Sequence, residues 1–403
     1  SLQIKSGGIT MQKQLYIFNP WHDMALANFT PYYKISSEIV CMSNDLSFLP
    51  VWYAPDDALI KIPDASAVET FCSQVSCFKK ISVERFVSNA LSCKKIVPWG
   101  WSPSLVHTLL SDGADASFLP DDEALAKIRY LSGRQRCVEV LSQLSSLGGI
   151  CGKAVCCYDV SQVRNFLDER HNVILKAPWS GSGRGLYRVS RQSWNANVQG
   201  WISRILRTQG YVMAEPIYNK VCDFAMEFYS SPDGKVSFAG YSLFETDDFG
   251  NYKQNILMSD ARIKKRLLSY GILNETLDSV RGRLLDIFSK MIAGNYTGYF
   301  GVDMMICDQN DNFLLHPCVE INMRMNMGVV SRIIFDRYLC PSSHGKFVIE
   351  HYNSDDEAVL SHQKMSSSMP LVVGSSGRIN SGYLTLTPLL PATRYQAYVI
   401  VKE

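Results

Sequence analysis

Polar side chains share one face of a predicted strand that is otherwise apolar. The strand covers residues 319–324 and follows an earlier apolar segment, residues 301–306. Side chains alternate across a strand, so Glu320, Asn322 and Arg324 lie on one face while their neighbours pack on the other. A row of polar groups is costly to bury unless a ligand or an ion binds it. This face is a candidate binding site, and the alternative is a solvated sheet face.

Asp303 lies within the earlier of these two segments. A polar turn, residues 308–312, separates the segments, and antiparallel pairing across it brings Asp303 near Glu320 if Pro317 forms a bulge. Two carboxylates and the amide of Asn322 then converge. Oxygen ligands of this kind suit Mg²⁺, which also binds the phosphates of substrates. The spacing therefore predicts a magnesium site.

A lysine followed by a glycine-rich loop forms a second candidate site. Lys176 lies in the apolar segment 173–178, and the loop covers residues 180–185. Three glycines in alternate positions let the backbone bring N–H groups against an anion, and the lysine adds a positive charge. The pattern predicts a phosphate clamp, and a plain hairpin tip is the alternative. The loop consists of Ser180, Gly181, Ser182, Gly183, Arg184 and Gly185.

A third candidate lies where an apolar strand ends in Glu215 and Pro216. Proline cannot donate to a strand ladder, so the backbone leaves its sheet there and exposes peptide groups that could pair with the edge of a purine. The alternative is an ordinary strand end. Asp223 then begins a strand over residues 224–229, which a Pro-Asp-Gly turn joins to residues 236–240 in a predicted hairpin.

Two turns near the N-terminus could line a substrate pocket. Predicted strands at residues 15–18 and 95–97 run into turns that contain His22, Asp23 and Trp101. In open α/β sheets, ligands bind at the carboxyl ends of the strands. The alternative interpretation of these three residues is turn chemistry and packing.

Short apolar segments alternate with loops and helices in the first 120 residues, which indicates a small α/β unit. Residues 39–42 and 51–53 are also predicted as strands. A polar stretch at residues 112–123 marks a boundary, and residues 124–147 are predicted as one long or broken helix. Apolar residues between 277 and 291 recur at helical intervals and predict an amphipathic helix with one buried face.

Composition narrows the class of protein. The chain has 403 residues, 46% of them hydrophobic, so about two or three folding units are expected. Its formal charge is only +2, so no global charge attracts nucleic acid or a membrane surface. No apolar run has the length of a membrane helix. The 12 cysteines are dispersed, and we interpret them as reduced thiols of a cytoplasmic protein. Residues 1–10 are interpreted as a tag, an overextended start or a disordered arm.

In their order along the chain, these motifs resemble those of the ATP-grasp superfamily. A strand lysine with a glycine-rich loop is followed by a Glu-containing hinge, an Asp strand and Glu-x-Asn-x-Arg, within about residues 126–340. The resemblance implies a chain of class α/β and α+β, with two α+β lobes that hold ATP behind a small α/β domain. We expect the α/β domain over residues 11–122, the N-terminal lobe over 123–215 and the C-terminal lobe, with closing strands, over 216–403.

The resemblance also implies roles in nucleotide binding. Lys176 would contact the adenine and the α-phosphate, and the loop 180–185 would cover the other phosphates. Glu215, with Pro216 and the backbone of Ile217, would form the adenine hinge. Asp223 would bind the ribose hydroxyls.

The polar strand face would carry the metal and the reacting groups. By resemblance, Asp303, Glu320 and Asn322 are the magnesium ligands, with Glu320 bridging two ions. Arg324 would stabilise the transferring phosphoryl group or the acyl-phosphate. The usual proline between the asparagine and the arginine is Met323 here, which changes packing and leaves every ligand position competent.

A further basic residue usually reaches the phosphates from just before the first lobe. Arg134 is the candidate, and Arg129 and Lys153 are its rivals.

The resemblance implies an ATP- and Mg²⁺-dependent ligase. It would join a small-molecule carboxylate to an amine or similar nucleophile through an acyl-phosphate and release ADP and phosphate. A small-molecule kinase and a non-catalytic, nucleotide-responsive binding protein are the alternatives. Many relatives of this architecture are homodimers, so a homodimer is one alternative, and the sequence leaves the oligomeric state open.

Overall fold

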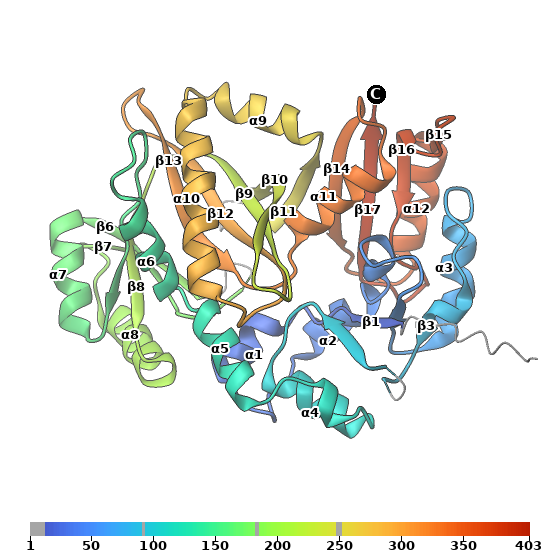
Figure 1. Ribbon diagram of the computed structural model, residues 1–403, viewed down its shortest axis with the longest axis horizontal. Coiled ribbons are helices and arrows are strands. Elements are labelled where there is room, and N and C mark those ends of the chain that lie inside the picture. Colours follow the sequence, from blue (N-terminus) through green and yellow to red (C-terminus); the bar gives the residue numbers. More distant parts are fainter. Residues whose placement is uncertain (1–12, 91–92, 182–184, 247–251) are drawn as a thin grey trace, which may run out of the picture.

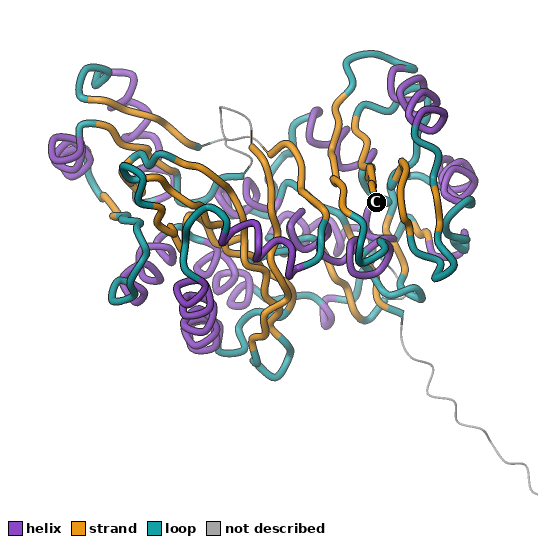
Figure 2. Tube along the Cα trace, turned by 90° about the horizontal axis from the view of Figure 1, so that it is seen from above, coloured by secondary structure: helices purple, strands orange, loops and turns teal. Residues whose placement is uncertain are grey.

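The computed structural model describes residues 13–90, 93–181, 185–246 and 252–403. They form three β-sheets with helices packed around them (Figure 1). Figure 2 shows the same elements from above, with helices at both ends of the molecule and also among the strands in its middle. Residues 182–184 of the glycine-rich loop, namely Ser182, Gly183 and Arg184, lie outside the described residues.

The first sheet is parallel, with strand order β3-β2-β1-β4. Its strands are β1 (Gln14–Ile17), β2 (Leu59–Lys61), β3 (Phe86–Val87) and β4 (Lys95–Pro98). The helices of this part of the chain are α1 (His22–Asn28), α2 (Ser37–Asp45), α3 (Val68–Val75) and α4 (Pro103–Ser111).

Two predicted strands of this unit are wrong. Residues 39–42 lie inside α2, which the Ser36 side chain caps at its N-terminus, and residues 51–53 overlap a 3₁₀ helix, Leu49–Trp52, with a proline in its first turn. A short apolar run fits a buried helix as well as a strand, so periodicity alone cannot separate the two. The cap and the proline were the signals that favoured helix.

The second sheet is antiparallel, with strand order β5-β8-β6-β7. Its strands are β5 (Val155–Cys157), β6 (Asn172–Lys176), β7 (Leu186–Ser190) and β8 (Val212–Pro216), with helices α7 (Val160–Arg170) and α8 (Ala196–Gln209) beside them (Figure 1). The helix predicted over residues 124–147 is present as a broken pair, α5 (Asp122–Ser132) and α6 (Gln135–Leu144). Gly133 and Arg134 form the break.

The third sheet has nine strands in the order β13-β12-β9-β10-β11-β14-β17-β16-β15. They are β9 (Lys220–Ser230), β10 (Val236–Thr246), β11 (Tyr252–Leu257), β12 (Gly298–Asp308), β13 (Phe313–Asn322), β14 (His344–His351), β15 (Val372–Val373), β16 (Ile379–Thr385) and β17 (Tyr395–Lys402). The helices are α9 (Asp260–Leu268), α10 (Asn274–Ile292), α11 (Met327–Tyr338) and α12 (Glu357–Ser368). The predicted hairpin is β9-β10, and the predicted amphipathic helix is α10, whose apolar face is buried.

One hydrophobic core joins the first sheet to the end of the chain. Trp52, fully buried, packs in the same cluster as Val330 of α11 and Val399 of β17. The indole Nε1 of Trp52 donates a hydrogen bond of 2.7 Å to the carbonyl oxygen of Leu386. The first sheet is therefore held against α11 and the C-terminal strands, and this packing places α1 near the end of β13.

Candidate functional site

Lys176 and Glu215 form a buried ion pair on neighbouring antiparallel strands, β6 and β8. Their Nζ and Oε2 atoms are 2.7 Å apart, and the side chains are 7% and 2% exposed. Lys176 Nζ also donates to the carbonyl oxygen of Val319, at 3.4 Å, so it reaches across to β13 of the large sheet. The second oxygen of Glu215 is buried and has no hydrogen-bond partner among the described residues.

Arg134 connects the two lobes. Its Nη1 donates to Ala177 O at 2.6 Å and to Ser180 Oγ at 2.7 Å, while its Nη2 pairs with Glu320 Oε1 at 2.7 Å. The break between α5 and α6 aims the side chain at these partners. Its rival Arg129 instead lies over the ring of Trp179, 4.0 Å from the ring centroid.

The described part of the glycine-rich loop lies against α1. A Cβ atom added to Gly181 would be 2.7 Å from Asp23 Oδ2, which a side chain at position 181 could not tolerate without a shift. Gly185 has φ = +112°, a conformation that favours glycine, and its carbonyl accepts a hydrogen bond from Ala177 N. These two glycines allow the loop to leave β6, pass close to Asp23 and return into β7.

Asp303 and Glu320 face each other across β12 and β13, as the alternation predicted. The register shifts between Asp303 and Met305, so the expected bulge is present opposite them. Burial, followed by the negative charge of Glu320, raises the pKa of Asp303 well above its usual range. Among the described residues, no group of three or more His, Cys, Asp or Glu could hold a metal ion. The predicted site has two carboxylates and the amide of Asn322.

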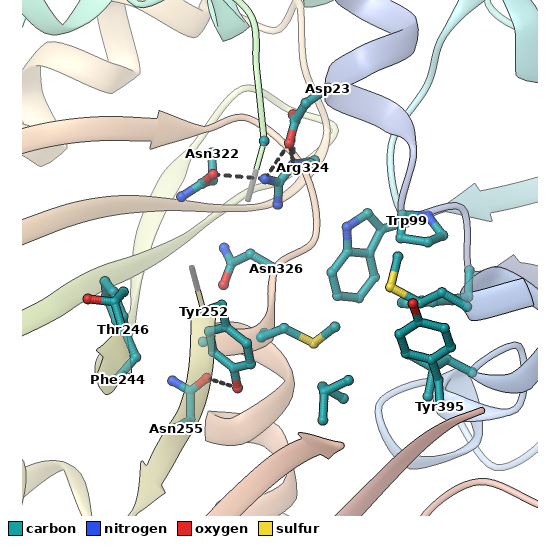
Figure 3. A pocket seen from close by; sticks show the side chains of 18 of the residues that line it. Asp23, Trp99, Phe244, Thr246, Tyr252, Asn255, Asn322, Arg324, Asn326 and Tyr395 are labelled. Atoms are coloured by element: carbon teal, nitrogen blue, oxygen red, sulfur yellow. Dashed lines mark hydrogen bonds and ion pairs between the residues drawn. The ribbon is translucent and has the colours of Figure 1, made fainter. Parts of the chain in front are cut away.

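Arg324 is held by Asp23 of α1 (Figure 3). Its Nη2 is 2.6 Å from Asp23 Oδ2, its Nε is 2.9 Å from Oδ1, and Nη2 also donates to Asn322 Oδ1 at 3.0 Å. Burial alone would raise the pKa of Asp23, but the charge of Arg324 and the hydrogen bonds from His22 and Arg324 together outweigh burial and hold that pKa well below its usual range. A further bond runs from Nη1 to the carbonyl of Met325, and among the described residues one N–H of the guanidinium has no partner.

The site opens into a cavity of about 440 Å³. Of the three residues predicted to line a substrate pocket, one lines this cavity and two do not. Asp23 lines the cavity. His22 is 1% exposed and lies beneath Gly100, and Trp101 packs in the core of the first sheet, so neither lines it. Trp99 lines it instead, against the ring of Phe18 at 5.0 Å.

The residues predicted to form the adenine hinge lie at one end of the second sheet. β8 ends at Pro216, and Ile217 beyond it is 41% exposed. Asp223 lies in β9 and accepts hydrogen bonds from Lys220 and Thr246, so its carboxylate is already paired.

Sequence reasoning missed Glu227, which lies in β9 and lines the cavity. Its carboxylate accepts hydrogen bonds from Ser242 Oγ at 2.7 Å and Asn326 Nδ2 at 3.0 Å. A Cβ atom on Gly301 or Gly328 would overlap this carboxylate, so both positions need glycine. The signal was a single carboxylate, Glu227, within the otherwise apolar segment 224–229. The same pattern had singled out Asp303 in the segment 301–306.

No protein-family model and no curated protein matches the chain. Solved structures do match. The chain is similar to N5-carboxyaminoimidazole synthetase from Staphylococcus aureus, solved with ADP, with a TM-score of 0.51, 11% identity and coverage of 97% of this chain and 93% of that one. It is also similar to the biotin carboxylase domain of Hydrogenobacter thermophilus 2-oxoglutarate carboxylase, solved as a dimer with MgADP, ADP and bicarbonate.

That second likeness has a TM-score of 0.51 and 14% identity, and it covers 98% of this chain and 86% of the other. Both likenesses run through nearly the whole chain and include all three sheets. At 11% and 14% identity, these likenesses show the fold of the chain and nothing about its activity. The fold is the one that the order of the sequence motifs predicted. The chain has the ATP-grasp fold.

Proposed function

We propose that the protein is an ATP- and Mg²⁺-dependent ligase that joins a carboxylate to an amine or similar nucleophile through an acyl-phosphate. The observation that carries the proposal is the contact of Arg134 with both lobes: it bonds the start of the glycine-rich loop through Ser180 and the metal-ligand strand through Glu320. Groups suited to a nucleotide and groups suited to a metal thus share one site, on the fold of ATP-dependent ligases.

The residues present fit the two groups that such a reaction needs. The unpartnered oxygen of Glu215, beside Lys176 at the hinge, is a buried acceptor that a ligand N–H would satisfy. Burial, and after it the negative charge of Glu320, raises the pKa of Asp303, and a bound divalent cation would offset the charge of these two carboxylates. Asp303, Glu320 and Asn322 would hold Mg²⁺, with Glu320 shared by two ions. Bound Mg²⁺ neutralises charge on the nucleotide phosphates.

The chain's own residues then position the reaction. A carboxylate oxygen attacks the γ-phosphorus and ADP leaves; the amine then attacks the acyl carbon, expels phosphate and loses a proton. Arg324 has one N–H without a partner among the described residues, which it can direct at the phosphoryl group, and Asp23 fixes the plane of the guanidinium. Such preorganised donors contribute most when the charge develops in a site that excludes water.

We expect the protein in the cytoplasm, as the dispersed cysteines of its sequence indicate, and we propose a homodimer. None of the helices in the described part of the chain is long and apolar enough to cross a membrane. Gel filtration with light scattering tests the dimer.

Thermal unfolding with and without MgATP tests the proposal. Ligand at one hundred times its Kd stabilises the folded chain by about 2.7 kcal/mol, and we expect a Mg²⁺-dependent rise in Tm that Lys176→Ala and Glu320→Gln both reduce. Lys127→Ala and Glu123→Gln, from an exposed ion pair on α5, are matched controls and should keep the full rise. Absence of a Mg²⁺-dependent rise, or an equal rise in all variants, would contradict the proposal.

A further inference from the structure

Arg134 holds one oxygen of Glu320 in a short and largely buried ion pair. Its Nη2 lies 2.7 Å from Glu320 Oε1, and the two side chains are 6% and 29% exposed. Burial alone would lower the pKa of Arg134, but the charge of Glu320, helped by Cys137, by the hydrogen bond to Glu320 and by Glu215, raises it. The guanidinium is therefore a full positive charge that lies directly on one of the proposed metal ligands.

The same arginine is fixed on the nucleotide side of the site. Its Nη1 donates to Ala177 O at 2.6 Å and to Ser180 Oγ at 2.7 Å, and its backbone N donates to Pro178 O at 3.2 Å. Its Nε–H is buried and has no partner among the described residues. Buried donors in proteins are nearly always satisfied, so this N–H suits an oxygen of the phosphates that the glycine-rich loop is proposed to cover.

A divalent cation on Glu320 would lie close to this positive charge. The proposed ligands of the cation, Asp303 and Glu320, face each other across β12 and β13, and Arg134 bonds Oε1 of Glu320. A cation on the same carboxylate is repelled by the guanidinium and competes with it for the oxygen. Nucleotide phosphates offset this repulsion, because they attract both the guanidinium and the cation.

We infer that Arg134 couples the metal to the nucleotide: it weakens divalent-cation binding at Asp303 and Glu320, and nucleotide phosphates relieve this effect when they bind the guanidinium. The inference rests on the proposed function and adds the order in which its ligands bind, with the metal entering together with the nucleotide. The coupling is reciprocal, so the metal also raises the affinity for the nucleotide. Asp303 and Glu320 are thereby protected from a divalent cation that arrives alone.

Binding of Mn²⁺, as a probe for Mg²⁺, to the full-length protein without nucleotide tests the inference, with the free ion measured by electron paramagnetic resonance. We expect Arg134→Gln, which removes the charge and keeps an N–H donor for Ala177 and Ser180, to bind Mn²⁺ at least about tenfold more tightly than the parent. Arg134→Lys keeps the charge and should bind Mn²⁺ as weakly as the parent. Arg134→Met replaces Arg134→Gln if the latter does not fold.

A second titration with Mn²⁺, in the presence of ADP, measures the coupling. ADP should tighten Mn²⁺ binding at least about threefold less in Arg134→Gln than in the parent. Arg129→Gln is the matched control, because this arginine of α5 lies over the ring of Trp179, and it should behave as the parent in both titrations.

The inference is overturned if Arg134→Gln binds Mn²⁺ no more tightly than the parent, or if Arg134→Lys binds it as tightly as Arg134→Gln. The Mg²⁺-dependent rise in Tm with MgATP, measured on the same preparation of the parent, separates this failure from that of the proposed function. The proposed function fails if that rise is absent, whereas the coupling alone fails if the rise is present and the charge of Arg134 has no effect on Mn²⁺ binding.

Discussion

Glu227 should make the folded chain less stable as the pH rises, whereas most carboxylates in proteins make the folded chain more stable as the pH rises. Its side chain is 1% exposed, and burial raises its pKa from 4.5 to about 7, against the hydrogen bonds from Ser242 and Asn326. Below pH 4.5 this carboxyl is protonated in both the folded and the unfolded chain. Between pH 4.5 and 7 the folded chain keeps a proton that the unfolded chain releases, so the free energy of unfolding falls as pH rises.

The size of this loss follows from the shift in pKa. One unit corresponds to about 1.4 kcal/mol, so the loss is about 3 kcal/mol once the pH exceeds 7. Glu227→Gln removes the charge and keeps the hydrogen bonds: the amide oxygen accepts from Asn326, and the amide nitrogen donates to Ser242 Oγ. We therefore expect the variant to be more stable than the parent by up to about 3 kcal/mol at pH 8 and nearly equal to it at pH 4.5.

Urea unfolding at pH 4.5, 6, 7 and 8, in EDTA and without nucleotide, measures this difference. Glu123→Gln, at a carboxylate that is 77% exposed on α5, is the control and should follow the parent at every pH. If Glu227→Gln is no more stable than the parent at pH 8, or if its advantage does not shrink as the pH falls, the assignment of a buried, charged Glu227 is refuted.

Two further substitutions test the packing and the ion pair of the site by urea unfolding at pH 7. Gly328→Ala places a methyl group against the carboxylate of Glu227 and should destabilise the folded chain by about 1 to 3 kcal/mol. Gly282→Ala on α10 has open space around it and should stabilise the folded chain by about 0.5 to 1 kcal/mol. Equal effects of the two substitutions would contradict the contact between Gly328 and Glu227. Asp23→Asn should destabilise by about 2 kcal/mol, because Arg324 loses its anion while 15% exposed, and an unchanged midpoint would show that the pair contributes nothing.

The alternation of side chains was enough to predict the strand pair that carries the proposed metal ligands. Asp303 and Glu320 are separated by a short polar turn, so their pairing is a local property of one hairpin, and the structure pairs them directly. The helical periodicity of α10 was equally local and equally predictable. Apolar runs of four residues in the first unit were not, because they fit either element until a cap or a proline is taken into account.

The order of the motifs along the chain and their short-range patterns predicted the fold, which the structure shows, and supplied the residues that we propose for nucleotide and metal binding. Only the tertiary structure decided how these groups meet. Asp23 pairs with Arg324 across 301 residues, and Arg134 pairs with Glu320 across 186. Such contacts depend on how the three sheets pack on one another, and that packing is set by the sum of many buried apolar contacts rather than by any local motif.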